Sequence, residues 1–272
     1  MTILVTGATG NVGAQIVAQL AEAGHSVRAL TRDASRASFP AGVEVAEGDL
    51  ADPGTLTAAL DGVTALHLIA IAGDNYQPLQ TAPEILKLAA EQGATRVTVL
   101  CGPTSQDVED AARASGIDTT ALYPVEFMSN LKEYAEQVRE TGTVTDGFGD
   151  SLSAIVHDAD IAAVAVAALT TDGHAGKTYP ITGPEVVTTR GKAAIIGEVL
   201  GREVPFVEVP EDEFRAGLIA QGWEEHAADW MVGVRRETPE IGRTVTDTVQ
   251  QVTGRPARSM AQWVDENRAL FG

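Results

Sequence analysis

Several features that are common in other classes of protein are scarce or missing in this sequence. It contains one cysteine, Cys101, so no internal disulfide can form, which fits a reducing compartment. No apolar run approaches the roughly 20 residues that a membrane-spanning helix needs. The N-terminus has no basic segment followed by an apolar stretch, so nothing indicates export, and we expect a cytoplasmic protein.

Positive charge is also scarce. Lys and Arg number 19 against 38 Asp and Glu, which gives a formal net charge of −19 at pH 7. Such a surface repels nucleic acid and anionic lipid, so we expect neither as a partner. A polyanionic ligand would need a local site that departs from the overall charge. The His, Cys and carboxylate residues show no metal-ligand spacing, and we expect no metal site.

The first half of the chain does contain a regular alternation of short apolar runs and helical patterns. This alternation is typical of an α/β fold in which helices connect the strands of a parallel sheet. Gly24, Gly62, Gly93 and Gly116 stand where left-handed residues would end such helices. We predict strands at residues 3–6, 26–31, 43–47, 65–70, 96–100 and 119–122, and helices near residues 11–23, 53–60, 78–92 and 106–115.

The pattern changes after Pro124, where helical segments predominate and sheet is sparse. "DADIAAVAVAALT" predicts a helix buried on most sides, and "KTYPITG" predicts one more strand. A final helix is expected at residues 260–270. We therefore predict a dinucleotide-binding domain from residues 1–124 and 157–183, and a smaller, mostly helical substrate-binding region from residues 125–156 and 184–272.

Three glycines, Gly7, Gly10 and Gly13, separate the first strand from the first helix. The first glycine permits a tight turn, the second removes a Cβ that would meet a phosphate, and the third allows the helix to pack closely. The helix N-terminus itself presents unpaired N–H groups and a positive dipole end. The motif predicts a Rossmann-type doubly wound sheet that binds a dinucleotide here, with Thr9, Asn11 and Val12 as further contacts.

The second strand ends in "ALTRD", and this stretch bears on the choice between NAD and NADP. An acidic residue at the strand end accepts hydrogen bonds from the ribose hydroxyls of NAD, whereas Thr31 and Arg32 stand here. Arg32 can pair with a 2′-phosphate, which favours NADP(H) over NAD(H). Asp33, the next residue, is the alternative contact to the ribose.

Two further strand ends supply candidate cofactor contacts. After the third strand, Asp49 and Leu50 could give the adenine one polar and one apolar contact, although Asp49 could equally cap the following helix. Ala70, at the end of the fourth strand, is a candidate contact as well.

The chain resembles the NmrA-like group of atypical short-chain dehydrogenases/reductases along nearly its whole length. The stretches that carry the resemblance are "TGATGNVG", "VRALTRD", "VEVAEGDL", "LYPVEFMSN", "DADIAAVAVAALT", "GKTYPITGPE" and "GEVLGREVPFVEVPEDEF". The resemblance implies quinone or dye reductases, NADP-sensing regulators without catalysis, or enzymes that tailor aromatic natural products. It also implies that Pro124, Phe127 and Met128, in "YPVEFM", flank the nicotinamide.

The sequence lacks the Tyr-x-x-x-Lys pair of typical short-chain dehydrogenases, which would supply a proton to a carbonyl oxygen. Quinone reduction needs less assistance, because the hydroquinone product is aromatic and water or a hydroxyl can protonate the developing oxyanion. The polar candidates for a catalytic role come from four places in the chain: Thr104 and Ser105, Tyr123, His157, and the group Asp74, Asn75 and Tyr76.

Other distinctive residues have a structural interpretation as well as a functional one. Cys101 and His67 are predicted to be inert core residues. Trp223 and Trp230 are expected to pack in the core of the helical region, and the alternative is an aromatic wall for a planar substrate.

These observations favour an NADP(H)-dependent oxidoreductase that acts on a quinone or related aromatic carbonyl, in a cleft between the carboxyl edge of the sheet and the helical region. One alternative is a non-catalytic NADP(H)-binding redox sensor. Another is an enzyme that assists the oxygenation of an aromatic polyketide. We expect a small aromatic substrate and a monomer or homodimer.

Overall fold

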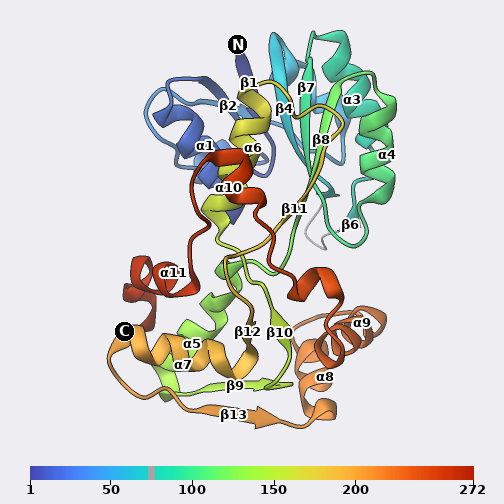
Figure 1. Cartoon of the computed structure of the whole chain (residues 1–272). Helices are drawn as coiled ribbons and strands as arrows, with labels where there is room; N and C mark the ends of the chain where they lie inside the picture. Colours follow the sequence, from blue (N-terminus) through green and yellow to red (C-terminus); the bar gives the residue numbers. More distant parts are fainter. Residues whose placement is uncertain (73–76) are drawn as a thin grey trace. The chain divides into compact units, whose positions relative to one another are not determined.

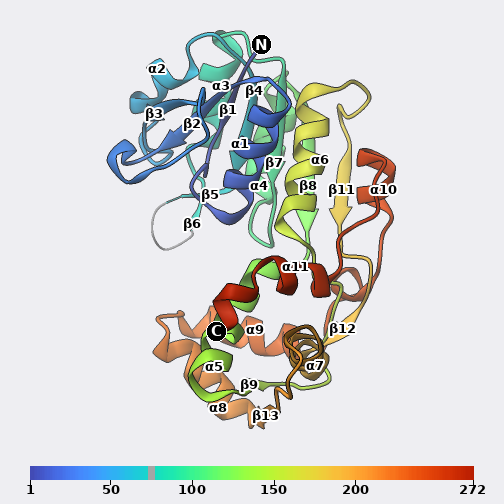
Figure 2. The same cartoon turned by 90° about the vertical axis from the view of Figure 1, so that its left-hand side faces the viewer.

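The computed structural model describes residues 1–72 and 77–272, and it divides the chain into two compact units, which we call unit 1 and unit 2 (Figures 1 and 2). Unit 1 comprises Met1–Pro124, Asp158–Ile181 and Gln251–Gly254. Unit 2 comprises Val125–His157, Thr182–Gln250 and Arg255–Gly272. The chain therefore passes several times between the two units.

Unit 1 is built on a seven-stranded parallel sheet, as predicted for an α/β fold. In spatial order its strands are β11 (Thr178–Ile181), β8 (Asp118–Pro124), β7 (Arg96–Leu100), β4 (Val63–Ile69), β1 (Thr2–Val5), β2 (Ser26–Thr31) and β3 (Glu44–Glu47). Successive strands run outward from β1 first to one side and then to the other. Such an arrangement has a switch point beside β1, where ligands of doubly wound sheets bind.

Helices cover both faces of this sheet (Figure 2). The helical segments of unit 1 are α1 (Asn11–Glu22), η1 (Ala34–Arg36), η2 (Pro53–Leu56), α2 (Thr57–Leu60), α3 (Ala82–Glu91), α4 (Gln106–Ala114) and α6 (Asp158–Thr170). The two helices α1 and α6 pack together, and the side chain of Gln19 donates to the carbonyl of Ala159 at 2.9 Å. On the other face, apolar residues of α2, α3 and α4 form one buried cluster with those of the strands.

Unit 2 has less sheet and more helix. Its elements are η3 (Met128–Leu131), α5 (Lys132–Thr141), β9 (Val144–Gly147), β10 (Leu152–Ser153), β12 (Val187–Thr188), α7 (Thr189–Leu200), β13 (Phe206–Val209), α8 (Glu211–Ala220), α9 (Glu225–Arg236), η4 (Glu240–Arg243), α11 (Met260–Glu266) and η5 (Arg268–Phe271). A further helix, α10 (Thr248–Thr253), belongs to both units. Strand β9 pairs in parallel with β13, and β10 pairs antiparallel with β12. Met128, Trp263 and Phe271 lie in the buried core of unit 2.

One predicted helix and one predicted core differ from the structure. The helix expected at residues 78–92 begins at Ala82, because Gln77–Pro78 instead form β6, which pairs antiparallel with β5 (Ile71–Ala72). Pro83, not Pro78, occupies the first turn of the helix, where a proline costs no hydrogen bond. The assignment of Trp223 and Trp230 to a core is wrong, since they are 37% and 49% exposed.

Within the described residues, no helix has both the length and the apolar character to cross a membrane.

Candidate cofactor site and its surroundings

The glycine loop between β1 and α1 lies at the switch point of the sheet. At each of its three glycine positions, a side chain would come too close to neighbouring atoms. Gly7 has a φ of +61°, and a Cβ there would lie 2.9 Å from the side chain of Ile69, at the end of β4. A Cβ on Gly10 would lie 3.2 Å from the carbonyl oxygen of Gly7. A Cβ on Gly13 would lie 2.1 Å from the same oxygen, so the helix can pack on the turn only without a side chain.

The start of α1 is open to an anion. Gly10 occupies the N-cap position, no side chain caps the helix, and its first turn contains no acidic residue. The first N–H groups of a helix have no partner within it, and the helix dipole adds positive potential at the same point. The loop therefore fits the pyrophosphate of a dinucleotide, which this backbone would bind without a charged side chain.

The residues after β2 bear on the preference for NADP. The carboxylate of Asp33 accepts hydrogen bonds from the backbone N–H and the hydroxyl of Ser35, at 2.9 and 2.5 Å. Asp33 thus caps the short helix η1, and this role competes with a contact to a ribose. The side chain of Arg32 is exposed beside it.

The three candidate cofactor contacts that follow β3 and β4, namely Asp49, Leu50 and Ala70, have structural roles. Asp49 accepts a hydrogen bond from the N–H of Ala51 at 2.9 Å, so its carboxylate shapes a turn, while Asp52 caps the next helix, η2. Leu50 and Ala70 are 8% and 3% exposed and belong to the buried cluster of unit 1.

Tyr123, one of the candidates for a catalytic role, is bound to a carboxylate. Its hydroxyl donates to Glu109 of α4 at 2.5 Å, and the other oxygen of Glu109 accepts from Arg113 at 2.8 Å. Burial and the hydrogen bond to Glu109 raise the pKa of Tyr123 above its usual range. Tyr123 therefore holds its proton more firmly than a free tyrosine does.

The loop after β7 brings the neighbouring candidates into a tight turn. The hydroxyl of Ser105 donates to the carbonyl of Gly102 at 2.8 Å and accepts from its N–H at 2.9 Å. Cys101 is 5% exposed, and burial raises the pKa of its thiol, which fits an inert core residue. Thr104 is exposed. The candidates Asp74, Asn75 and Tyr76 lie outside the described residues.

The segment after β8 continues into unit 2, where main-chain bonds hold it. Pro124 is the last residue of β8, and Phe127 forms a parallel bridge with Val156. The N–H of Met128 donates to the carbonyl of Val156 at 2.8 Å, and the N–H of Val156 donates to the carbonyl of Glu126 at 2.8 Å. His157, the next candidate, is 5% exposed, and its Nε2 lies 3.2 Å from a carboxylate oxygen of Glu266.

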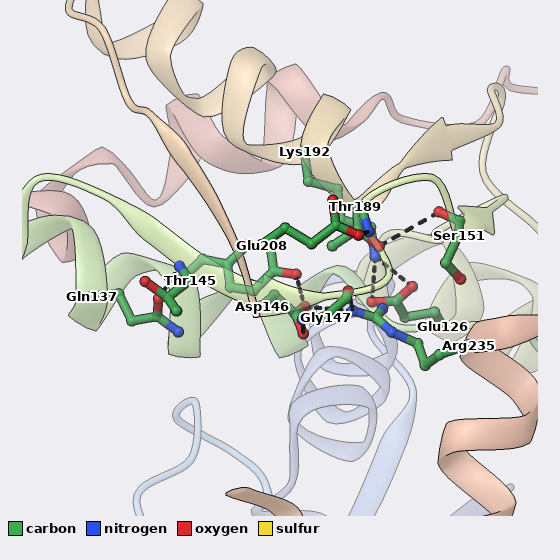
Figure 3. A network of polar contacts seen from close by, with 12 residues as sticks. Glu126, Gln137, Thr145, Asp146, Gly147, Ser151, Thr189, Lys192, Glu208 and Arg235 are labelled. Carbon is green, nitrogen blue, oxygen red and sulfur yellow. Dashed lines mark hydrogen bonds and ion pairs between the residues drawn. The ribbon is translucent and has the colours of Figure 1, made fainter. Parts of the chain in front are cut away.

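A buried ion pair fixes this segment, and sequence reasoning missed it (Figure 3). The ammonium of Lys192, on α7, is 2.7 and 2.6 Å from the two carboxylate oxygens of Glu126, and its side chain is 1% exposed. Burial acts to raise the pKa of Glu126, but Lys192, together with a hydrogen bond from Ser153 and the charge of Arg235, outweighs it and holds the pKa below its usual range. The one available signal was a lone lysine in the apolar stretch "GKAAIIG".

The same network continues toward β9. Asp146 accepts hydrogen bonds from the hydroxyl of Tyr134 and from the guanidinium of Arg235. In Figure 3 Arg235 lies between Asp146 and Glu126. Two buried cations thus hold two carboxylates of unit 2, and breaking either pair would leave a poorly solvated charge.

In the described part of the chain, no three His, Cys, Asp or Glu side chains gather in a way that could hold a metal ion.

Comparisons with known proteins give this geometry a family. A family model described as NAD(P)H-binding matches residues 7–109. The chain is 37% identical to the (4-alkanoyl-5-oxo-2,5-dihydrofuran-3-yl)methyl phosphate reductase of Streptomyces griseus, and the match covers 99% of each chain. It is 34% identical to the NAD(P)H azoreductase of Xenophilus azovorans, again over 99% of each chain.

A solved structure shows the same fold over the whole length. The NADPH-dependent quinone oxidoreductase of Escherichia coli, solved with NADPH, superposes with a TM-score of 0.81 at 24% identity, covering 98% of this chain and 100% of that one. The structure of NmrA with NADP shares the fold with a TM-score of 0.75 at 19% identity, which agrees with the resemblance seen in the sequence. The chain therefore belongs to the NAD(P)H-dependent oxidoreductases of the NAD(P)H-binding family.

Proposed function

We propose that the protein is an NADPH-dependent reductase of a quinone or a related conjugated carbonyl. The observation that carries the proposal is the glycine loop with its uncapped helix, followed by Arg32 beside an Asp33 that is already engaged by Ser35. Uncapped N–H groups suit the pyrophosphate, and an exposed guanidinium suits a 2′-phosphate. Cofactor contacts at Thr9, Asn11 and Val12 belong to the same proposal.

The class of acceptor is inferred from the lack of an assigned proton donor. When bound, the reduced nicotinamide supplies a hydride. A quinone takes up that hydride and one proton from solvent to give a hydroquinone, so it needs no strong protein acid. Ser105 is held in a turn, and Tyr123 and His157 are bound to Glu109 and Glu266, so we assign none of these three as the proton donor. We assign positioning of the acceptor as the main contribution of this chain.

The relatives support an acceptor that is conjugated and unsaturated. Their names describe an azoreductase, a quinone oxidoreductase and a reductase of an acylated dihydrofuranone phosphate. We propose the same class of acceptor for this chain, either a flat quinone or a conjugated carbonyl that bears an acidic group. Reduction with NADPH also fits the cytoplasmic location expected from the sequence.

The test is steady-state oxidation of NADPH and of NADH, without oxygen, against naphthoquinones, anthraquinones and conjugated lactones. We expect saturable oxidation with a lower KM for NADPH than for NADH. Tyr123→Phe is expected to keep the rate within about threefold, because general-acid catalysis typically contributes about a hundredfold or more and Tyr123 is not assigned that role.

Two results would overturn the proposal. If NADPH binds but no acceptor oxidises it, the protein is a dinucleotide sensor. If turnover is absent without oxygen, and appears with oxygen consumption when the assay is repeated in air, the protein assists an oxygenation.

A further inference from the structure

Unit 2 contains a hollow of about 400 Å³, which we call the unit 2 hollow. It lies among the loop that follows β9, the end of α9 and the segment after it, and three of its lining residues are arginines. Its volume is within the range of small-molecule sites. The residues of the lining that carry the argument are Phe148, Ser151, Arg235, Arg236, Thr238 and Arg243.

Arg235 is built into the wall of the hollow. Its side chain is 13% exposed, its guanidinium is bound to Asp146, and it stacks over the ring of Phe214 at 5.6 Å from the centroid. Its Nε is buried and has no hydrogen-bond partner among the described residues. A buried donor without a partner is costly, so the protein itself leaves this guanidinium incompletely satisfied.

The other arginines differ in how far they are already paired. Arg236 is bound to Glu211, which lies outside the lining. Arg243, in η4, is exposed, and the described residues give it no ion pair. Its guanidinium therefore has its full set of N–H donors available to a ligand.

Two of the three carboxylates in the lining share one arginine that lies outside it. Asp150 and Glu208 both bind Arg190, at 3.1 and 2.9 Å, and Glu208 also accepts from the N–H of Gly149 at 2.9 Å. Glu237 is the remaining lining carboxylate, and it is exposed. The one guanidinium of Arg190 offsets only one of the two charges of Asp150 and Glu208, so an anion in the hollow would depend on directed hydrogen bonds from the lining arginines and not on a net positive charge.

Phe148 supplies an apolar surface, and its backbone is unusual. It has a φ of +54°, and no other described residue except glycine has a positive φ. Its ring packs edge-on against Phe214, with the ring centroids 5.4 Å apart. A bulky residue in this conformation is strained, and such strain is often found at ligand sites.

We propose that the unit 2 hollow binds an acidic group of the substrate, a phosphate monoester or a carboxylate, through Arg235 and Arg243, with Phe148 against the adjoining apolar part. Planar guanidinium groups pair with both kinds of oxyanion. The hydroxyls of Ser151 and Thr238, 3.2 Å apart in the same lining, add neutral hydrogen-bond donors and acceptors. That the ligand is a substrate rests on the proposed function, whereas the anion site itself does not.

The test is calorimetric titration of the full chain, without cofactor and in low-salt buffer free of phosphate. The probes are 1-naphthyl phosphate, 1-naphthoate and 1-naphthol, which share the ring and differ in charge. We expect at least one of the two anions to bind ten times more tightly than 1-naphthol. Arg243→Gln should weaken that anion about tenfold and leave 1-naphthol unchanged, because a charge-assisted pair is lost.

The matched control is Arg139→Gln, which removes an exposed arginine of α5 outside the hollow and should change none of the affinities. Equal affinity for all three probes, or an equal loss in both variants, would overturn the site. Inorganic phosphate binding as tightly as 1-naphthyl phosphate would overturn the assignment to a substrate. Because no turnover is measured, a failure of quinone reduction would leave this result standing.

Discussion

In unit 1 the candidate contacts to the cofactor are mainly backbone groups, whereas in unit 2 the candidate ligand contacts are long charged side chains. The glycine loop needs no side chain at three positions, and the helix that it opens has no cap. In unit 2, Arg235 lines the proposed site, and both Arg235 and the buried Lys192 are held by carboxylates far away in the sequence. We therefore expect different kinds of substitution to reduce stability and ligand binding in the two units.

The difference has a physical cause. A pyrophosphate is bound by oriented N–H groups, which any sequence provides if the backbone can approach closely. The substrate that accepts the hydride is instead expected to be bound by side chains. When such a side chain is charged and buried, an opposite charge must balance it. Steric changes should thus damage unit 1 most, and changes in charge should damage unit 2 most.

The largest expected effect is steric and belongs to unit 1. Gly13→Val places a Cβ against the carbonyl of Gly7, and neither backbone group can move easily. We expect a loss of about 3 kcal/mol in the free energy of unfolding, from overpacking, and no measurable NADPH binding. The measurements are chemical denaturation and a fluorescence titration with NADPH.

A glycine of unit 2 provides the control. Gly217, on the exposed side of α8, has open space at its Cβ position, and Gly217→Ala should stabilise the protein by about 0.5–1 kcal/mol. If both glycine variants bind NADPH as the wild type does, the glycine loop is not the cofactor site.

The second effect is electrostatic and belongs to unit 2. Lys192→Met leaves Glu126 without its cation, and we expect a loss of about 2–3 kcal/mol, because Glu126 is 28% exposed and water offsets part of the cost. The double variant Glu126→Gln/Lys192→Met should recover part of that loss. Denaturation with urea measures both.

The matched lysine is Lys87 of unit 1, which is 75% exposed and 3.9 Å from Glu91. Lys87→Met should change the free energy of unfolding by less than about 0.5 kcal/mol. A large loss in the free energy of unfolding for Lys87→Met, and none for Lys192→Met, would contradict the claim that changes in charge damage unit 2 most.

The third effect depends on pH and concerns His67 in the central strand β4. Burial lowers the pKa of His67 to about 4, so in acid the unfolded chain takes up a proton that the folded chain refuses. Below pH 6.5 this contribution to stability falls, by about 2 kcal/mol at pH 5, and it is lost in full only below pH 4. Comparing denaturation at pH 7 and pH 5 measures it.

In His67→Gln this part of the pH dependence should disappear, whatever the stability at pH 7. His226→Gln, at an exposed position of α9, is the control and should keep the wild-type slope. An unchanged slope in His67→Gln would show that other groups cause the loss in acid.

The smallest expected effect is on the choice of cofactor. Arg32→Gln should raise the Kd for NADPH roughly tenfold at low salt and leave that for NADH unchanged, because one exposed charged contact to the 2′-phosphate is lost. Arg36→Gln, in the same turn, is the matched control. Equal changes for both cofactors would contradict the role proposed for Arg32.

The sequence allowed the fold of unit 1 to be predicted because its signals are local. The strands of the sheet and most of its helices were predicted within a few residues, and the helix near residues 78–92 was misplaced because Pro83, not Pro78, opens it. The glycine spacing carries steric information within seven residues of sequence. Such signals need no knowledge of distant contacts.

The side-chain network of unit 2 could not be predicted in the same way. Lys192 and Glu126 are 66 positions apart, and Arg235 and Asp146 are 89 apart. Periodicity does not report such pairs. It also misled at Trp223 and Trp230, where a helical pattern of aromatic residues was interpreted as a core although both side chains are exposed.

The most direct test of the account is a single-turnover experiment without oxygen. Protein saturated with NADPH is mixed rapidly with 1,4-naphthoquinone, and the absorbance of the reduced nicotinamide is followed. We predict a loss of one equivalent of NADPH per active site, faster than in the absence of protein, and no such loss with Gly13→Val. NADPH that stays bound and reduced in the wild-type protein, across quinones and conjugated lactones, would contradict the account.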